Sequence, residues 1–178
     1  MRRALTGFAA VATLASIALV GPLGADPGNK YGDTTRTDLC EGADDNNEDG
    51  SLTVAINGPE KLWPPNHKYV DVSVTATDSD GSDVMLETEG THEQYAEDGT
   101  EMNGAGNTAD DVSPAAASGM GAGSATTSHD VRAERSGQDQ TGRTYTITYE
   151  AESSDGGTCF GSFDILVPHD MRGGADWK

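Results

Sequence analysis

The chain has 178 residues and carries 30 acidic against 11 basic side chains, which gives a formal net charge of −19 at pH 7. This excess argues against nucleic acid and anionic membrane as partners, because both are bound through basic surface that releases counterions. It fits calcium binding or adaptation to high salt, and composition does not separate the two.

The N-terminal segment predicts a secretory signal peptide. A charged start is followed by an apolar run from Ala4 to Val20, and the small residue Ala25 marks the expected cleavage site. The alternative is a membrane anchor, but the run is shorter than the roughly 20 apolar residues that span a bilayer. We therefore expect residues 1–25 to be removed and the protein to be secreted or associated with the cell surface, without membrane insertion after cleavage.

The remaining sequence divides into three parts. Residues 26–50 are polar, rich in Gly, Asp and Asn, and without periodicity, which predicts a flexible acidic leader. Residues 51–170 have the length and patterning of one folded domain. Residues 171–178 are expected to form a C-terminal tail.

Alternating apolar and polar residues predict the strands of this domain. The segment 89–125 has few large apolar side chains and is expected to be a long Gly/Asn/Asp-rich loop that holds one weak strand. The pattern indicates an antiparallel β-sandwich, with a small closed barrel as the alternative. The strands are expected at residues 51–56, 69–77, 84–88, 125–134, 143–151 and 159–168.

A Trp-Pro-Pro motif after the first strand predicts a structural corner. The two prolines fix the backbone and the Asn-His pair turns the chain into the next strand. Packing is favoured over a sugar-stacking role for Trp63, so Trp63→Ala should cost about 3 to 5 kcal/mol if the ring is fully buried. Tyr145 resembles the tyrosine corner of Greek-key sandwiches. The residues assigned to this corner are Trp63, Pro64, Pro65, Asn66, His67 and Tyr145.

Four sequence blocks carry a family resemblance. They are LWPPNHK at 62–68, RAERSG at 132–137, GRTYTI at 142–147 and VPHD at 167–170. In this order they resemble a bacterial extracellular immunoglobulin-like module. The resemblance implies an all-β, immunoglobulin-like sandwich of about seven strands and implies no catalytic residues. The chain departs from the family pattern in lacking a cysteine in the turn after the second strand.

The expected strand order also predicts which turns meet. If neighbouring strands alternate in direction, the turns at 78–83 and 153–157 lie at the end where the first strand begins. For the strands before and after segment 89–125 to keep alternating in direction, this segment must cross the sandwich an odd number of times. Cys40 and Cys159 fall at the same end, and in an exported chain they predict one disulfide, with two free thiols as the alternative.

The start of the domain resembles a calcium loop. Residues 45–53 match its first nine positions, but the twelfth position, which should be a bidentate Glu, is Ile56. Carboxylates from the two turns could complete the coordination, and the alternative is a solvated acidic leader. Calcium is the one cofactor that we expect, with the ligands Asp45, Asn47, Asp49, Ser51, Asp78, Asp80, Asp83 and Asp155.

Two histidines and a charged block lie toward the other end. His67 and His169 could join a transition-metal site, but without tight spacing they are better interpreted as bonding to loop backbone. The charges of Arg132, Glu134 and Arg135 predict ion pairs between strands.

Three functional hypotheses follow, of which the first is favoured. It is a non-catalytic module, structural or adhesive, that binds an extracellular protein or polymer and is stabilised by calcium. The second is a carbohydrate-binding module, for which the aromatic candidates Trp63, Tyr95 and Trp177 are scattered. The third is a metal-dependent hydrolase. We expect no enzyme, since no Gly-x-Ser-x-Gly elbow is present and no acid lies within a strongly apolar stretch.

Overall fold

The structure is a computed structural model that describes residues 34–38, 40, 47, 51–93, 111–135 and 142–170. None of these residues belongs to a helix that is long and apolar enough to cross a membrane. They form the strands β1 Thr34–Asp38, β2 Leu52–Gly58, β3 Tyr69–Asp78, β4 Asp83–Glu93, β5 Val112–Ser113, β6 Ala116–Ala122, β7 Ser124–Arg132, β8 Arg143–Ser153 and β9 Thr158–Val167.

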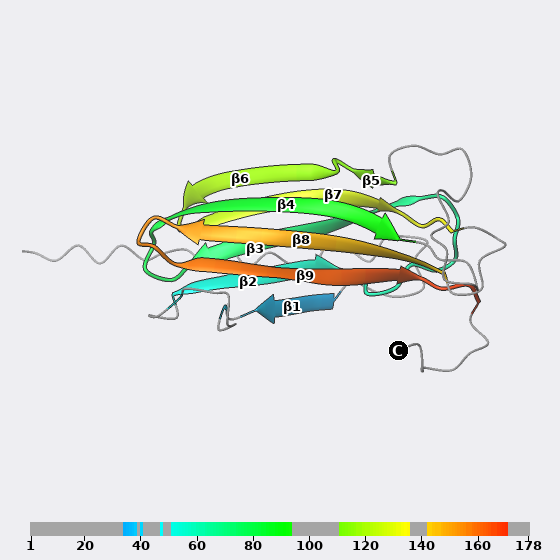
Figure 1. The fold of residues 1–178 in the computed structure, drawn as a ribbon, viewed down its shortest axis with the longest axis horizontal. Helices are drawn as coiled ribbons and strands as arrows, with labels where there is room; N and C mark the ends of the chain where they lie inside the picture. The colour runs from blue at the N-terminus through cyan, green and yellow to red at the C-terminus, as the bar shows by residue number, and fades with distance from the viewer. Residues whose placement is uncertain are drawn as a thin grey trace, which may run out of the picture.

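The strands form two antiparallel sheets that pack as a sandwich (Figure 1). One sheet has the order β1-β2-β3-β7-β5, and the other has the order β6-β4-β8-β9. Within them, β2-β3-β7 and β4-β8-β9 follow the order of strands A-B-E and C-F-G in immunoglobulin-like sandwiches. The expected fold class is therefore confirmed. The short strand β5 and the edge strand β1 add to the predicted set.

The core lies between the sheets because strand residues alternate between two faces. On β3, Val70, Val72 and Val74 are at most 4% exposed. On β8, Ile147 faces the same core and is fully buried. Each such aliphatic side chain stabilises the fold by about 1.5 to 3 kcal/mol relative to exposure. The period-2 pattern that predicted these strands therefore also identified the core.

The described residues of segment 89–125 lie mainly in strands, one of which is the strand that was expected there. The first residues of the segment extend β4 to Glu93, and β6 then crosses the sandwich once, as the strand order required. Gly119 and Gly121 let β6 lie against the backbone of β7, since a Cβ at Gly119 would be 2.8 Å from the Thr126 carbonyl oxygen. The residues of β6 are small and give no apolar alternation, so the sequence did not show where this strand begins and ends. Residues 94–110 lie outside the described residues.

The leader 26–50 also contains structure that its composition did not predict. Residues Thr34–Asp38 pair antiparallel with β2 as an edge strand, and Cys40 is buried. An edge strand needs only backbone hydrogen bonds along one side, so the polar sequence TTRTD can form it. The signal peptide 1–25 and the tail 171–178 lie outside the described residues.

Candidate functional site

The turns at 78–83 and 153–157 lie together at one end of the sandwich, which we call the acidic pole. The Ser82 hydroxyl donates to the Asp155 carboxylate at 3.4 Å, and the Asp83 amide donates to the Ser154 hydroxyl at 3.1 Å. The strand order therefore brings together two turns that are about seventy residues apart in sequence.

Asp78 is the buried carboxylate of the acidic pole, with 3% of its surface exposed. It accepts hydrogen bonds from the Ser153 hydroxyl at 2.6 Å, the Ser51 hydroxyl at 3.3 Å and the Asp80 amide at 2.8 Å. Burial by itself would raise the pKa of Asp78, but these donors and the Ser82 amide lower it below its ordinary value of 3.8. Asp78 thereby ties the start of β2 to the end of β8.

The other predicted calcium ligands have different positions. The Asn47 side chain accepts from the Leu52 amide at 3.0 Å and donates to the Leu52 carbonyl at 2.9 Å. Asp80 and Asp83 are exposed, whereas Asp45 and Asp49 lie outside the described residues. Within the described residues, the turn carboxylates do not place three ligand oxygens within 4.8 Å of one another.

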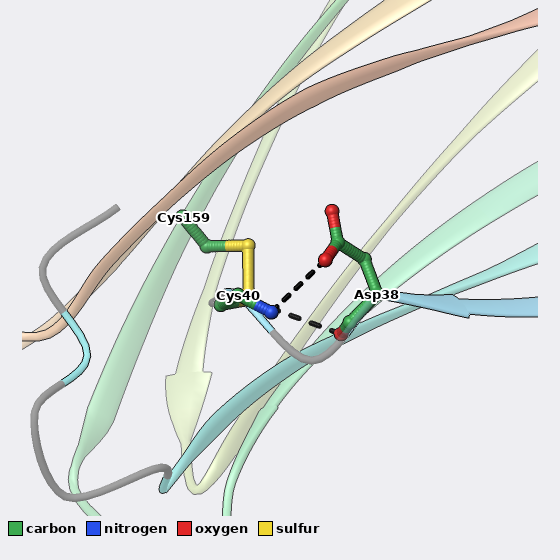
Figure 2. Close-up of side chains that lie close together, drawn as sticks. All are labelled: Asp38, Cys40 and Cys159. Carbon is green, nitrogen blue, oxygen red and sulfur yellow. Dashed lines mark hydrogen bonds between the residues drawn. A yellow bond between two sulfur atoms is a disulfide. The ribbon is translucent and has the colours of Figure 1, made fainter. Parts of the chain in front are cut away.

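Asp38, Cys40 and Cys159 do form such a group, but the two cysteines are joined to each other (Figure 2). The disulfide confirms the predicted pairing and leaves no thiolate to bind a metal. Asp38 accepts a hydrogen bond from the Cys40 amide at 2.9 Å and another from the Tyr149 hydroxyl. This group is therefore a structural link from β1 to β8 and β9.

At the opposite end, residues 62–68 connect β2 to β3 and form what we call the corner pole. Leu62 is fully buried and its amide donates to the Leu166 carbonyl at 2.9 Å, whereas Trp63 is only half-buried. Because the Trp63 ring is not fully buried, Trp63→Ala should lower the free energy of unfolding by less than the roughly 3 to 5 kcal/mol expected for a fully buried ring. His67 has a positive φ of 62° and its amide donates to the Ala133 carbonyl at 3.0 Å.

A buried ion network stabilises the corner pole. The Arg143 guanidinium is fully buried, 2.5 Å from the Asp111 carboxylate, and Arg132 lies 3.5 Å from the same carboxylate. Arg143 also donates to the Tyr145 hydroxyl at 3.2 Å. Burial raises the pKa of Tyr145 to about 12, although the neighbouring guanidinium acts in the opposite direction. Tyr145 is thus a core residue held by Arg143.

The two histidines that were considered for a transition-metal site lie beside different carboxylates. His67 Nδ1 lies 3.4 Å from Glu134, and His169 Nδ1 lies 3.7 Å from Asp170. Glu134 also pairs with Arg132 at 3.7 Å. Arg135 donates to the Pro168 carbonyl at 3.1 Å, which is a contact to the backbone.

His129 is a buried polar residue that sequence reasoning missed. It is fully buried on β7, where Nδ1 lies 2.7 Å from the Pro114 carbonyl oxygen and Nε2 lies 2.8 Å from the Thr88 hydroxyl. Thr88 in turn donates to Thr127 at 3.0 Å. Only its place among alternating inward residues of β7 could have indicated burial.

The solvent side of the sheet β6-β4-β8-β9, which we call the β4–β8 face, carries a hollow of about 610 Å³. Glu87 on β4 lies directly opposite Glu150 on β8, and Glu150 lies opposite Phe160 on β9. Glu89 also lines the hollow, and Phe160 is 41% exposed. The hollow thus combines carboxylates with an exposed aromatic ring.

A second hollow of about 170 Å³ lies on the same face, nearer the acidic pole. It is lined by Met85, Met120 and Glu152, and Met120 is 77% exposed. Alternation in the sequence indicated which side chains point outward. It did not indicate that the outward side chains of β6, β4, β8 and β9 would lie side by side. The β4–β8 face is therefore the candidate functional site.

The fold and this surface define an immunoglobulin-like β-sandwich with one acidic, partly apolar face. No family model matches the chain, and no curated protein matches it. Among solved structures, it is similar to the periplasmic chaperone SfaE, with 17% sequence identity and a TM-score of 0.39. The match covers 67% of this chain, which spans 58% of that structure.

Proposed function

We propose that this protein is a secreted, non-catalytic immunoglobulin-like module, structural or adhesive, that binds an extracellular protein or polymer. The observation that carries the proposal is the hollow on the β4–β8 face, where the exposed ring of Phe160 lies among carboxylates. Exposed apolar side chains rimmed by polar groups are typical of interaction surfaces. A rigid two-sheet scaffold holds this surface in one geometry.

Two features support an extracellular setting. The Cys40–Cys159 disulfide is of the kind that persists in oxidising compartments outside the cytosol. The sequence of residues 1–25 has the three parts of a signal peptide. The proposed membership in the bacterial extracellular immunoglobulin-like family rests on the four blocks given above.

Calcium stabilisation of the acidic pole is part of the proposal. The oxygen ligands suit calcium, but Asp78 already accepts donors from the protein, so the exposed Asp80 and Asp83 are the better candidates. Calcium should raise the melting temperature at fixed ionic strength, and Asp80→Asn with Asp83→Asn should abolish that rise. Titration calorimetry without heat on adding calcium would count against the site.

A carbohydrate-binding module is the second candidate, because Phe160 offers one exposed ring in the hollow. The hydrolase hypothesis has less support, since His67 and His169 pair with separate carboxylates. The test is saturable binding of the immobilised protein to a panel of neutral glycans, acidic polypeptides and cationic polypeptides. Saturable binding to any member supports the module, whereas absence of binding to the whole panel contradicts it.

A further inference from the structure

The strand register places outward side chains of the β4–β8 face in rows across the sheet. One row runs from Ser118 through Glu87 and Glu150 to Phe160. The row on one side contains Glu89, and the row on the other contains Glu152 opposite Met85. Three successive rows therefore each present at least one carboxylate.

The spacing of these rows follows from strand geometry. Outward residues two apart on one strand are separated by about 6.8 Å, because an antiparallel strand rises about 3.4 Å per residue. An extended polypeptide presents alternate side chains at the same interval. Lys or Arg at every second position of such a segment would therefore meet one carboxylate in each row.

Charge on the β4–β8 face has one sign. The outward positions of β4, β6, β8 and β9 include Glu87, Glu89, Glu150 and Glu152 but no Lys or Arg. Like charges directly opposite each other on neighbouring strands are destabilising, and a bound cation would relieve this repulsion. The opposed pair Asp71 and Asp130 on the other sheet shows that such pairing alone does not mark a site.

What distinguishes the β4–β8 face is the combination of carboxylates with hollows and exposed apolar groups. Phe160 and Met120 are 41% and 77% exposed. An aromatic face beside carboxylates is suited to an ammonium or guanidinium group, since both interactions are attractive. By contrast, Asp71 and Asp130 are flanked on one side by Ser73 and Ser128 and on the other by the Tyr69–Arg132 pair, in which the protein's own guanidinium already covers the aromatic ring.

We infer that the β4–β8 face is the docking surface for an extended cationic polypeptide segment with Lys or Arg at alternate positions. This inference rests on the proposed binding function and specifies its partner. The segment lies along β4 and β8, with its cations over the three rows of glutamates. The same cations lie near Phe160 at one flank and the methionines at the other, whereas the intervening side chains point away from the sheet.

The test uses fluorescence anisotropy with the purified protein and the labelled peptide Lys-Thr-Lys-Thr-Lys-Thr-Lys. The double variant Glu87→Gln/Glu150→Gln should weaken binding by about tenfold, since it removes two ion pairs. The matched control Asp71→Asn/Asp130→Asn removes the same charge from the other sheet and should change affinity less than twofold. Relief of repulsion should keep the melting temperature of the glutamine variant at or above that of the wild type.

The peptide Lys-Lys-Lys-Lys-Thr-Thr-Thr, with the same composition, tests the spacing and should bind more weakly. Equal weakening by the two double variants, equal affinity for the two peptides, or no saturable binding of the alternating peptide would each overturn the inference. If a neutral glycan or acidic polypeptide binds instead, the inference fails while the proposed module stands. Failure of the whole panel contradicts both.

Discussion

Tyr149 on β8 reaches across Gly161 on β9 and donates its hydroxyl to the Asp38 carboxylate at the end of β1. A Cβ at Gly161 would meet the Tyr149 ring, 2.9 Å from Cε1 and closer to the hydroxyl. Gly161→Ala should therefore displace the ring and lower the free energy of unfolding by about 1 to 3 kcal/mol. Denaturant unfolding measures this loss. Gly157→Ala is the control, because a Cβ there has its nearest neighbours at 3.6 Å; equal losses would contradict the account.

The disulfide should contribute most of the stability of the β1 attachment. Cys40 and Cys159 are 119 residues apart, so their link removes much conformational entropy from the unfolded chain. Replacing both by Ser should lower the free energy of unfolding by about 4 to 5 kcal/mol in the chain-entropy model. Circular dichroism should still report a β-sandwich. Two reactive thiols in the purified wild-type protein would refute the link.

Leu62 should matter more than Trp63 for the corner pole. Leu62 is fully buried, so Leu62→Ala should cost about 2 to 5 kcal/mol, whereas half-buried Trp63→Ala should cost less than about 2 kcal/mol. Urea unfolding of both variants measures the order. A larger loss for Trp63→Ala would mean that its ring packs more tightly than its exposure indicates.

Asp78 should make the fold sensitive to acid. Its folded pKa lies below the ordinary 3.8, so its stabilising effect is present above that value and is lost as pH falls through the folded pKa. Asp78→Asn should cost about 1 to 3 kcal/mol at pH 7, because four donors lose their charged acceptor. The difference from wild type should shrink below about pH 4 in unfolding experiments at several pH values. A difference that stays constant with pH would argue against this role.

Removing one partner of the Asp111–Arg143 pair should strongly lower the free energy of unfolding. Each partner is buried, so Asp111→Ala leaves an uncompensated guanidinium and should cost about 3 to 5 kcal/mol. Replacing both by apolar residues, as in Asp111→Leu/Arg143→Met, should recover much of that loss. A double-mutant cycle by chemical denaturation measures the coupling, and simple additivity of the two changes would disprove it.

Local pattern determined the strands and their faces. The alternating valines of β3 predicted both a strand and its buried side, because the period of a strand is two residues. The same reasoning placed the turns at 78–83 and 153–157 at one end and paired Cys40 with Cys159. Strand order required one crossing strand in segment 89–125, but local pattern did not locate β6, and it did not predict β1. Their sequences are small or polar, and their pairing depends on backbone hydrogen bonds to other strands.

The sequence by itself thus determined the fold class, the disulfide and the charge of the surface. Only the tertiary structure decided which charges are buried and which face solvent together. Asp111 and Arg143 meet because β5 brings a distant segment to the start of β8, and no local pattern encodes that contact. Glu87 and Glu150 become one surface because the register of β4 and β8 is fixed by the whole sheet, and that register is a property of long-range pairing.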